Sequence, residues 1–304
     1  MKPSRSEFIS IRGLRYHVRH WGNDDAPMLF MLHGWMDMSA TFQFLVDAFA
    51  HEWHVVAPDW RGFGLTESAS SSASTYWQPD YLADLDLLLD HYSAQQAVVL
   101  LGHSLGANVA AIYAGVRPAR IAKLILLEGF GVAATQATQA PARYAAWLDQ
   151  LRAPPVLRTY GSAAEVAARL QKNNPRLSAQ RADFLSRHWA RSDAAGRWEI
   201  LADAAHRLPN PYLYRVDEVM ACWDNITADV LWIEGAGSEL VARLGGDGCE
   251  ERGEGARLAA AQQEVERRLS FIHKVRRLRV ENAGHMLQHD QPEILAAAIE
   301  KFLR

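Results

Sequence analysis

Ser104 is the residue whose surroundings best fit a chemical role. It is the central residue of Gly102-His103-Ser104-Leu105-Gly106, a G-x-S-x-G motif. An apolar run over residues 97–101 precedes the motif and a helical pattern over residues 105–116 follows it. A sharp strand-to-helix turn needs slender glycines beside its central residue, and it holds the serine hydroxyl above the sheet at the positive end of the helix. This context predicts a nucleophile; the alternative is a serine that only caps a helix.

A serine nucleophile needs a general base to take its proton at neutral pH. His285 is the best candidate among the 12 histidines, because it follows the strand predicted at residues 275–280 on a loop that contains Gly284. That loop is expected at the same sheet edge as Ser104. His289 is a weaker candidate, since it falls near the predicted start of the last helix.

The oxyanion that forms during acyl transfer needs two backbone N–H donors. One is expected from Leu105, which follows the nucleophile. The other is expected from Trp35, in the loop after the apolar run at residues 28–32, where Gly34 allows a tight turn.

Three polar residues near these loops are expected to have structural roles. His33 is interpreted as a structural hydrogen-bonding residue rather than a catalyst. Asp59 and Arg61, in the turn after the next strand, are interpreted as a brace for the loops.

The elements that must position these groups alternate between strand and helix, and the strands carry no polar face. Such a pattern predicts an α/β fold with a mostly parallel sheet covered on both sides. A hairpin is expected to lead into this sheet, and a capped helix with Asp290 as its N-cap is expected to end the chain. The strands are predicted at residues 7–11, 14–21, 28–32, 53–57, 97–101, 121–127, 230–233 and 275–280, and the helices at 42–49, 81–92, 105–116, after 255 and after 290.

A different composition sets off the middle of the chain. Residues 131–227 contain Ala-, Arg- and Leu-rich helical patterns and no buried-strand run, so we interpret them as a helical cap on a core made of residues 1–130 and 228–304. Six aromatic residues are expected on the inner face of the cap, where they form a pocket or simply pack its helices: Trp147, Trp189, Trp198, Trp223, Tyr144 and Tyr160. Residues 235–255 hold seven of the 20 glycines and are interpreted as a mobile loop.

In this order, four segments resemble the α/β-hydrolase superfamily: His33-Gly34-Trp35, Asp59-Trp60-Arg61-Gly62-Phe63-Gly64, the motif around Ser104, and Gly284-His285. Within it, His33 to Asp37 and residues 123–129 are similar to the serine hydrolase-like proteins. The resemblance implies the α/β-hydrolase fold and a catalytic triad that needs no cofactor.

The third member of that triad departs from the pattern of the superfamily. The resemblance implies an aspartate in a Gly-x-x-Asp turn, but the turn here reads Gly235-Ala236-Gly237-Ser238, with Glu239 one residue later. The alternative acid is Glu128, at the end of the strand after the nucleophile helix, an arrangement similar to that of haloalkane dehalogenases. Either carboxylate could orient the imidazole. A residue at a strand end is held more rigidly than one in a glycine-rich loop, which favours Glu128 over Glu239.

The composition excludes several other classes of function. The net charge of −3 and the lack of a basic stripe give no support for a nucleic-acid partner. No apolar run reaches the ~20 residues of a membrane span, and the first residues carry no signal-peptide pattern. The two cysteines are not in metal or redox spacing, so a cytoplasmic protein is expected.

These features predict a serine hydrolase that cleaves a carboxylic ester or related acyl bond of a small molecule. Two alternatives remain open at this point: a lyase or C–C-bond hydrolase on the same triad, and a non-catalytic ligand-binding member of the fold. The sequence does not indicate the natural substrate or the oligomeric state.

Overall fold

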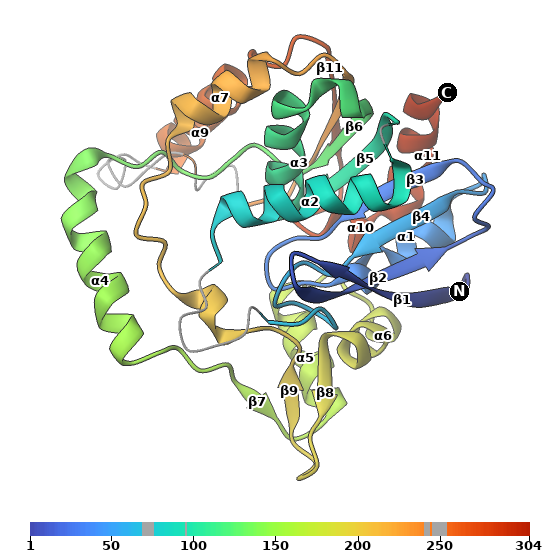
Figure 1. Ribbon diagram of the computed structural model, residues 1–304, viewed down its shortest axis with the longest axis vertical. Helices are drawn as coiled ribbons and strands as arrows, with labels where there is room; N and C mark the ends of the chain where they lie inside the picture. The colour runs from blue at the N-terminus through green and yellow to red at the C-terminus, as the bar shows by residue number, and fades with distance from the viewer. Residues whose placement is uncertain (69–75, 95, 240–243, 245–253) are drawn as a thin grey trace.

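An eight-stranded sheet with helices on both faces forms the centre of the molecule (Figure 1). The computed structural model describes residues 1–68, 76–94, 96–239, 244 and 254–304. The strand order is β1-β2-β4-β3-β5-β6-β10-β11; neighbouring strands from β4 to β11 are parallel, whereas β1 and β2 form an antiparallel hairpin and β2 pairs antiparallel with β4. The strands are β1 (Ser4–Ile11), β2 (Leu14–Trp21), β3 (Met28–Leu32), β4 (His54–Pro58), β5 (Val98–His103), β6 (Ile121–Leu127), β10 (Asp229–Gly235) and β11 (Val275–Val280).

This sheet confirms the predicted α/β-hydrolase architecture. The bounds of β2, β3, β6 and β11 match the predicted runs, and the other strands differ by one to three residues at an end. Strand β4 is buried along its whole length because helices cover both faces of the sheet. The continuous apolar runs of the sequence follow from this burial.

Two hydrophobic clusters, one on each face of the sheet, form the core. The first cluster packs four helices against the sheet: α2 (Gln78–Ser93), α3 (Leu105–Val116), α7 (Val216–Asp224) and α9 (Glu254–Leu269). The second packs α1 (Gln43–Ala48), α10 (Leu287–Asp290) and α11 (Pro292–Leu303). The motif around Ser104 therefore lies at the start of a helix whose buried apolar residues pack in the first cluster.

The segment between β6 and β10 contains helices, as predicted, but also a small antiparallel sheet of order β7-β9-β8. Its strands have only two or three residues, too few for a period-2 pattern to be visible in the sequence. In chain order the elements before α7 are the 3-10 turn η3 (Ala137–Gln139), α4 (Ala140–Arg152), β7 (Thr159–Tyr160), α5 (Ala163–Asn173), α6 (Ala179–Trp189), β8 (Ala190–Ser192), β9 (Trp198–Ile200) and the 3-10 turn η4 (Ala204–Arg207).

The position of Trp223 on helix α7 differs from the prediction that this residue lies on the inner face of the cap. Trp223 is 1% exposed and packs in the main core cluster with residues of α3, so its ring does not line an inner face of the cap. This prediction was wrong because the sequence of an amphipathic helix indicates which face is apolar but not which other element that face packs against.

The end of the chain also differs from the prediction. Asp290 is the last residue of α10, and Gln291 is the N-cap of α11. The carboxylate of Asp290 instead accepts hydrogen bonds from Gly284 N and Asn174 Nδ2, both at 2.8 Å. It therefore ties the loop before His285 to the segment between β6 and β10.

The glycine-rich stretch at residues 235–255 is only partly described. Residues 240–243 and 245–253 lie outside the described residues, so the predicted mobile loop stays a prediction. The first turns of this stretch, through Glu239, belong to the described chain. In the described part, no helix is long and apolar enough to cross a membrane.

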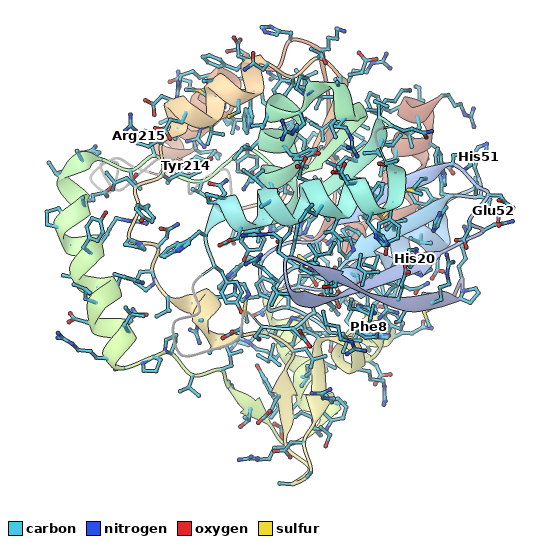
Figure 2. The ribbon with its side chains drawn as sticks, viewed as in Figure 1. Phe8, His20, His51, Glu52, Tyr214 and Arg215 are labelled. Atoms are coloured by element: carbon cyan, nitrogen blue, oxygen red, sulfur yellow. The ribbon has the colours of Figure 1, made fainter. Side chains whose placement is uncertain are left out.

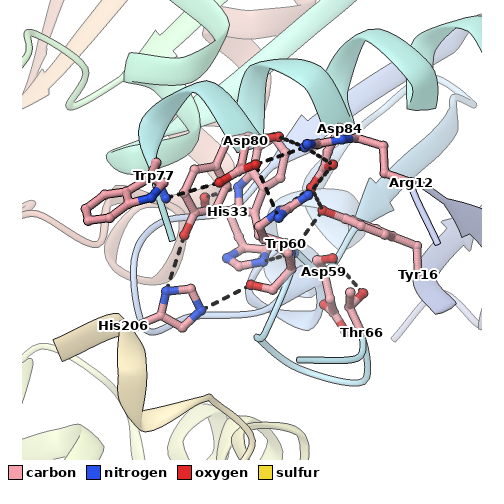
Figure 3. A network of polar contacts seen from close by, with 12 residues as sticks. Arg12, Tyr16, His33, Asp59, Trp60, Thr66, Trp77, Asp80, Asp84 and His206 are labelled. Atoms are coloured by element: carbon pink, nitrogen blue, oxygen red, sulfur yellow. Dashed lines mark hydrogen bonds and ion pairs between the residues drawn. The ribbon is translucent and has the colours of Figure 1, made fainter. Parts of the chain in front are cut away.

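A buried ion pair ties the loop after β4 to α2 (Figure 3). Arg61 donates from Nε and Nη2 to the two oxygens of Asp84 at 2.5 and 2.6 Å, and the Tyr16 hydroxyl donates to the same carboxylate at 2.5 Å. Burial alone would lower the pKa of Arg61, but its ion pair with Asp84 outweighs burial and raises that pKa. These contacts agree with the predicted bracing role of Arg61.

His206, in η4, connects the segment between β6 and β10 to this braced loop. Its ring stacks between Phe63 and Tyr76, with centroid separations of 3.7 and 3.6 Å. Nε2 donates to the Arg61 carbonyl at 3.1 Å, and Nδ1 accepts from the Tyr81 hydroxyl at 3.2 Å, which assigns a neutral ring. Burial lowers the pKa of His206 to about 3.

We predict that His206 makes the protein less stable as the pH falls. The unfolded chain binds a proton at this position below its ordinary pKa of about 6.5, whereas the folded chain does so only near pH 3. The free energy of unfolding should therefore fall as the pH is lowered from 6.5 to 4.5. Over that range it should fall by about 1 to 2 kcal/mol less in the His206→Phe variant than in the wild type. Urea titrations at several pH values measure this difference. The exposed His91→Gln variant is the control, and identical pH slopes for wild type and His206→Phe would contradict the prediction.

Candidate active site

Ser104 lies in the tight turn between β5 and α3. Its backbone has φ 53° and ψ −113°, a conformation that L-residues rarely adopt. Its N–H donates to Leu127 O at 2.9 Å, so the turn is tied to the end of β6. A Cβ at Gly106 would lie 2.2 Å from Leu32 O, and one at Gly102 would lie 2.5 Å from Ala107 N. Both flanking glycines are therefore required by close backbone contact, as predicted.

The predicted oxyanion donors flank this turn. Leu105 is the first residue of α3, so its N–H is one of the four that lack an intrahelical acceptor. A Cβ at Gly34 would lie 3.3 Å from Ser104 Cβ, which shows how closely the loop bearing Trp35 approaches the serine. In the part of the chain that the structure describes, no acceptor takes the amide hydrogen of Trp35.

A contact from α6 holds the loop that bears Trp35. The indole N–H of Trp189 donates to Met36 O at 2.7 Å, and Met36 itself has a positive φ of 56°. The loop is thus fixed by the segment between β6 and β10, a constraint that the sequence pattern did not indicate.

Glu128 follows β6 and His285 lies in the loop after β11, and the structure brings their side chains together. His285 Nδ1 lies 3.4 Å from Glu128 Oε2, slightly longer than the ~2.6–3.2 Å of a well-formed catalytic hydrogen bond. The side chain of Glu128 is fully buried, and that of His285 is 33% exposed. Among the described contacts the Ser104 hydroxyl makes no hydrogen bond to this ring; such bonds are often long in proteins without substrate.

Two further contacts complete the surroundings of Glu128. Gly235 N donates to Oε1 at 2.7 Å, and the hydroxyl of Ser238 donates to Oε2 at 2.5 Å. Glu128 also has a positive φ of 56°, which turns its side chain from β6 toward β10. The sequence did not single out Ser238 as a hydrogen-bonding partner; the signal available was its place in the turn where an acid was expected.

The other predicted candidates lie elsewhere. Glu239 is exposed. His289 is buried, with Nε2 2.7 Å from Thr41 Oγ1, and burial lowers its pKa to about 3. Both are outside the group formed by His285 and Glu128.

His33 and Asp59 hold the neighbouring loops, as predicted. His33 Nε2 accepts from Trp60 N at 2.8 Å and its Nδ1 donates to Gly34 O at 2.7 Å, while burial lowers its pKa to about 4. Burial alone would raise the pKa of Asp59. The 2.7 Å hydrogen bond from His17, the charges of His17 and His33 and the hydrogen bond from Leu65 N together outweigh burial and hold that pKa well below its usual range.

His103 is a supporting residue that the sequence did not identify. Its Nε2 donates to the carbonyl of His285 at 2.8 Å, and Gln288 Nε2 lies 3.4 Å from its Nδ1. Burial holds the pKa of His103 well below its ordinary value, so the ring is neutral. His103 thus supports the backbone of the histidine loop from the residue next to the serine.

A cavity of about 220 Å³ borders both predicted oxyanion residues. Its lining includes no Asp, Glu, Lys or Arg among the described residues. Of the six aromatic residues assigned to the cap, only Trp147 lines this cavity, whereas Trp189, Trp198 and Tyr160 pack in a cluster within that segment. Tyr214, labelled in Figure 2, contributes from the segment just before α7. The aromatic residues of the lining are Trp35, Tyr76, Trp77, Tyr81, Trp147 and Tyr214, together with His206.

Comparison with known proteins shows the family to which this chain belongs. The family profile of the α/β hydrolase fold matches residues 27–292. The chain belongs to the α/β-hydrolase fold family. It is 28% identical over 242 residues to a serine hydrolase-like protein of Danio rerio, covering 76% of this chain and 72% of that protein. A serine hydrolase-like protein of Dictyostelium discoideum is 27% identical over 251 residues, covering 77% and 68%.

Solved structures agree with the fold. The thioesterase domain from the curacin biosynthetic pathway superposes with a TM-score of 0.80 at 23% identity, covering 98% of this chain and 99% of that chain. An esterase from Mycobacterium tuberculosis superposes with a TM-score of 0.70 at 18% identity, covering 99% and 92%. At these identities the likeness concerns the fold alone.

The strained backbone of Ser104 leads to a stability prediction. Because glycine adopts positive φ without steric cost, Ser104→Gly should be more stable than Ser104→Ala by about 1 kcal/mol, although both lack the hydroxyl. Urea denaturation of the two variants measures the difference. Equal stability, or a more stable alanine variant, would contradict the presence of strain at this residue.

Proposed function

We propose that the protein is a serine hydrolase that cleaves a carboxylic ester or related acyl bond of a small molecule. Ser104 acts as the nucleophile, His285 as the general base and acid, and Glu128 as the carboxylate that orients the ring. The observation that carries the proposal is the contact between His285 Nδ1 and the buried Glu128, at the same sheet edge as the strained serine turn.

The proposed reaction has two halves. The Ser104 hydroxyl attacks the carbonyl carbon while His285 takes its proton, and the N–H groups of Leu105 and Trp35 stabilise the oxyanion. His285 then gives the proton to the leaving oxygen, which departs as an alcohol. A water molecule activated by His285 attacks the acyl-enzyme and releases the carboxylic acid. No step needs a cofactor.

The cavity beside the oxyanion donors is the proposed acyl site. Aromatic rings are the largest group in its lining, which holds no Asp, Glu, Lys or Arg among the described residues, and burial keeps His206 neutral. The cavity therefore favours an uncharged apolar or aromatic acyl group. We propose that the segment from α4 to η4 forms the cap that closes this site, whereas α7 belongs to the core. A carboxylate in the acyl chain would lose its hydration without finding a cationic partner in this lining.

The nucleophile is tested by covalent labelling. A fluorophosphonate probe should modify Ser104 in the wild type, and Ser104→Ala should abolish labelling and lower turnover of short p-nitrophenyl esters by about 10³-fold or more. Mass spectrometry of the labelled peptide and initial rates check both results. Thermal unfolding should be unchanged in Ser104→Ala, since the hydroxyl does not set the turn. Retained turnover in that variant would overturn the proposal, and labelling without turnover of any ester would favour the lyase or C–C hydrolase alternative.

The acid is tested by a matched pair of variants. Glu128→Gln keeps the size of the side chain but removes the charge that stabilises the imidazolium, so turnover should fall by about 10²- to 10⁴-fold. Glu239→Gln is the control and should change turnover little, because Glu239 is exposed. The opposite order of effects would assign the acid to Glu239.

A further inference from the structure

The hydroxyl of Ser238 occupies an unusual position beside the proposed triad. It donates to Glu128 Oε2 at 2.5 Å, and this is the same oxygen that lies 3.4 Å from His285 Nδ1. The other oxygen of Glu128 is taken by Gly235 N at 2.7 Å. The carboxylate is therefore shared between the turn after β10 and the histidine.

The turn that carries Ser238 is itself held against the histidine loop. Ser238 N donates to Gly235 O at 3.0 Å, and Gly237 N donates to Ala283 O at 2.8 Å. A Cβ at Gly235 would lie 2.4 Å from Gly284 O, so the two backbones are in close contact. Ser238 is thus fixed relative to the segment that ends at His285.

We propose that Ser238 is a positioning residue of the triad: its hydroxyl holds the long side chain of Glu128 in place and limits how strongly that carboxylate binds His285. The inference rests on the proposed function. Two N–H or O–H donors that share one carboxylate oxygen compete for its negative charge. The bond from Ser238 is the shorter of the two, so the interaction of this oxygen with the His285 ring is the weaker one.

The same geometry explains why a donor, and not an acid, suits position 238. A carboxylate there would lie beside the carboxylate of Glu128 in a buried site, where two like charges oppose each other's ionisation. A serine instead donates a hydrogen bond to the shared oxygen Oε2 of Glu128. Glu128 and Ser238 thus act as one unit that spans from β6 to β10.

The first test uses the pH profile of kcat/KM with a p-nitrophenyl ester. Ser238→Ala should lower kcat/KM at pH 7 by about 10-fold, because Glu128 is less well held. Its acidic limb should move to higher pH by about one unit, because the freed carboxylate binds the protonated ring more strongly. Ser238→Thr keeps the hydroxyl and should retain the wild-type profile. A purely structural role would change the rate without moving the limb, so an unmoved acidic limb in a folded Ser238→Ala protein overturns the inference.

The second test moves the acid. An aspartate at position 238 would place its carboxylate on the turn packed against the histidine loop, so Ser238→Asp combined with Glu128→Gln should recover at least 10-fold of the activity that Glu128→Gln alone loses. No recovery in a folded double variant would show that position 238 does not reach the ring. Fluorophosphonate labelling of the wild type distinguishes failure of the proposed function from failure of this inference. If Ser104 is not labelled, the proposed function is wrong. If Ser104 is labelled, the two tests above concern the role of Ser238 alone.

Discussion

The parallel pairing of β5, β6, β10 and β11 is the constraint on which the site depends. Parallel strands end at one edge of the sheet, so the residues that follow each strand meet there although they are far apart in the chain. Ser104 follows β5, Glu128 follows β6, and His285 follows β11. The hydrophobic clusters on both faces fix the register of these strands, and hence the distances between the three side chains.

The position of Glu128 shows how a long side chain and its backbone conformation bring a carboxylate to a turn that has no aspartate of its own. The turn after β10 carries a serine where the resemblance implied an aspartate. Glu128 reaches this turn from the neighbouring strand because its positive φ directs the side chain sideways, and because its carboxylate finds donors in Gly235 and Ser238. These donors hold the carboxylate of Glu128 at the place where it meets His285 Nδ1.

The segment between β6 and β10 holds the loops of the core that lie beside Ser104. His206 stacks on the braced loop after β4, and Trp189 binds the loop that bears Trp35 through Met36 O. Asn174 binds Asp290, which in turn holds Gly284. These contacts connect the segment to both loops that border the serine. A change in the position of this segment would therefore move the loop that bears Trp35 and the loop that bears His285 together.

The sequence by itself determined the elements whose signals are local. The apolar runs, together with the hairpin pattern at the start of the chain, predicted the eight strands to within a few residues. The motif around Ser104 predicted the strained turn, because close backbone contact demands glycine at fixed positions. The choice between Glu128 and Glu239 as partner of His285 depended on strand register and on a side chain 157 residues from the histidine, which no local pattern encodes. Tertiary packing alone likewise assigned Trp223 to the core, gave Asp290 its role at Gly284, and brought Ser238 to Glu128. The reason is physical: backbone preferences act between neighbours in the chain, whereas hydrogen-bond partners of buried groups are decided by which elements pack together.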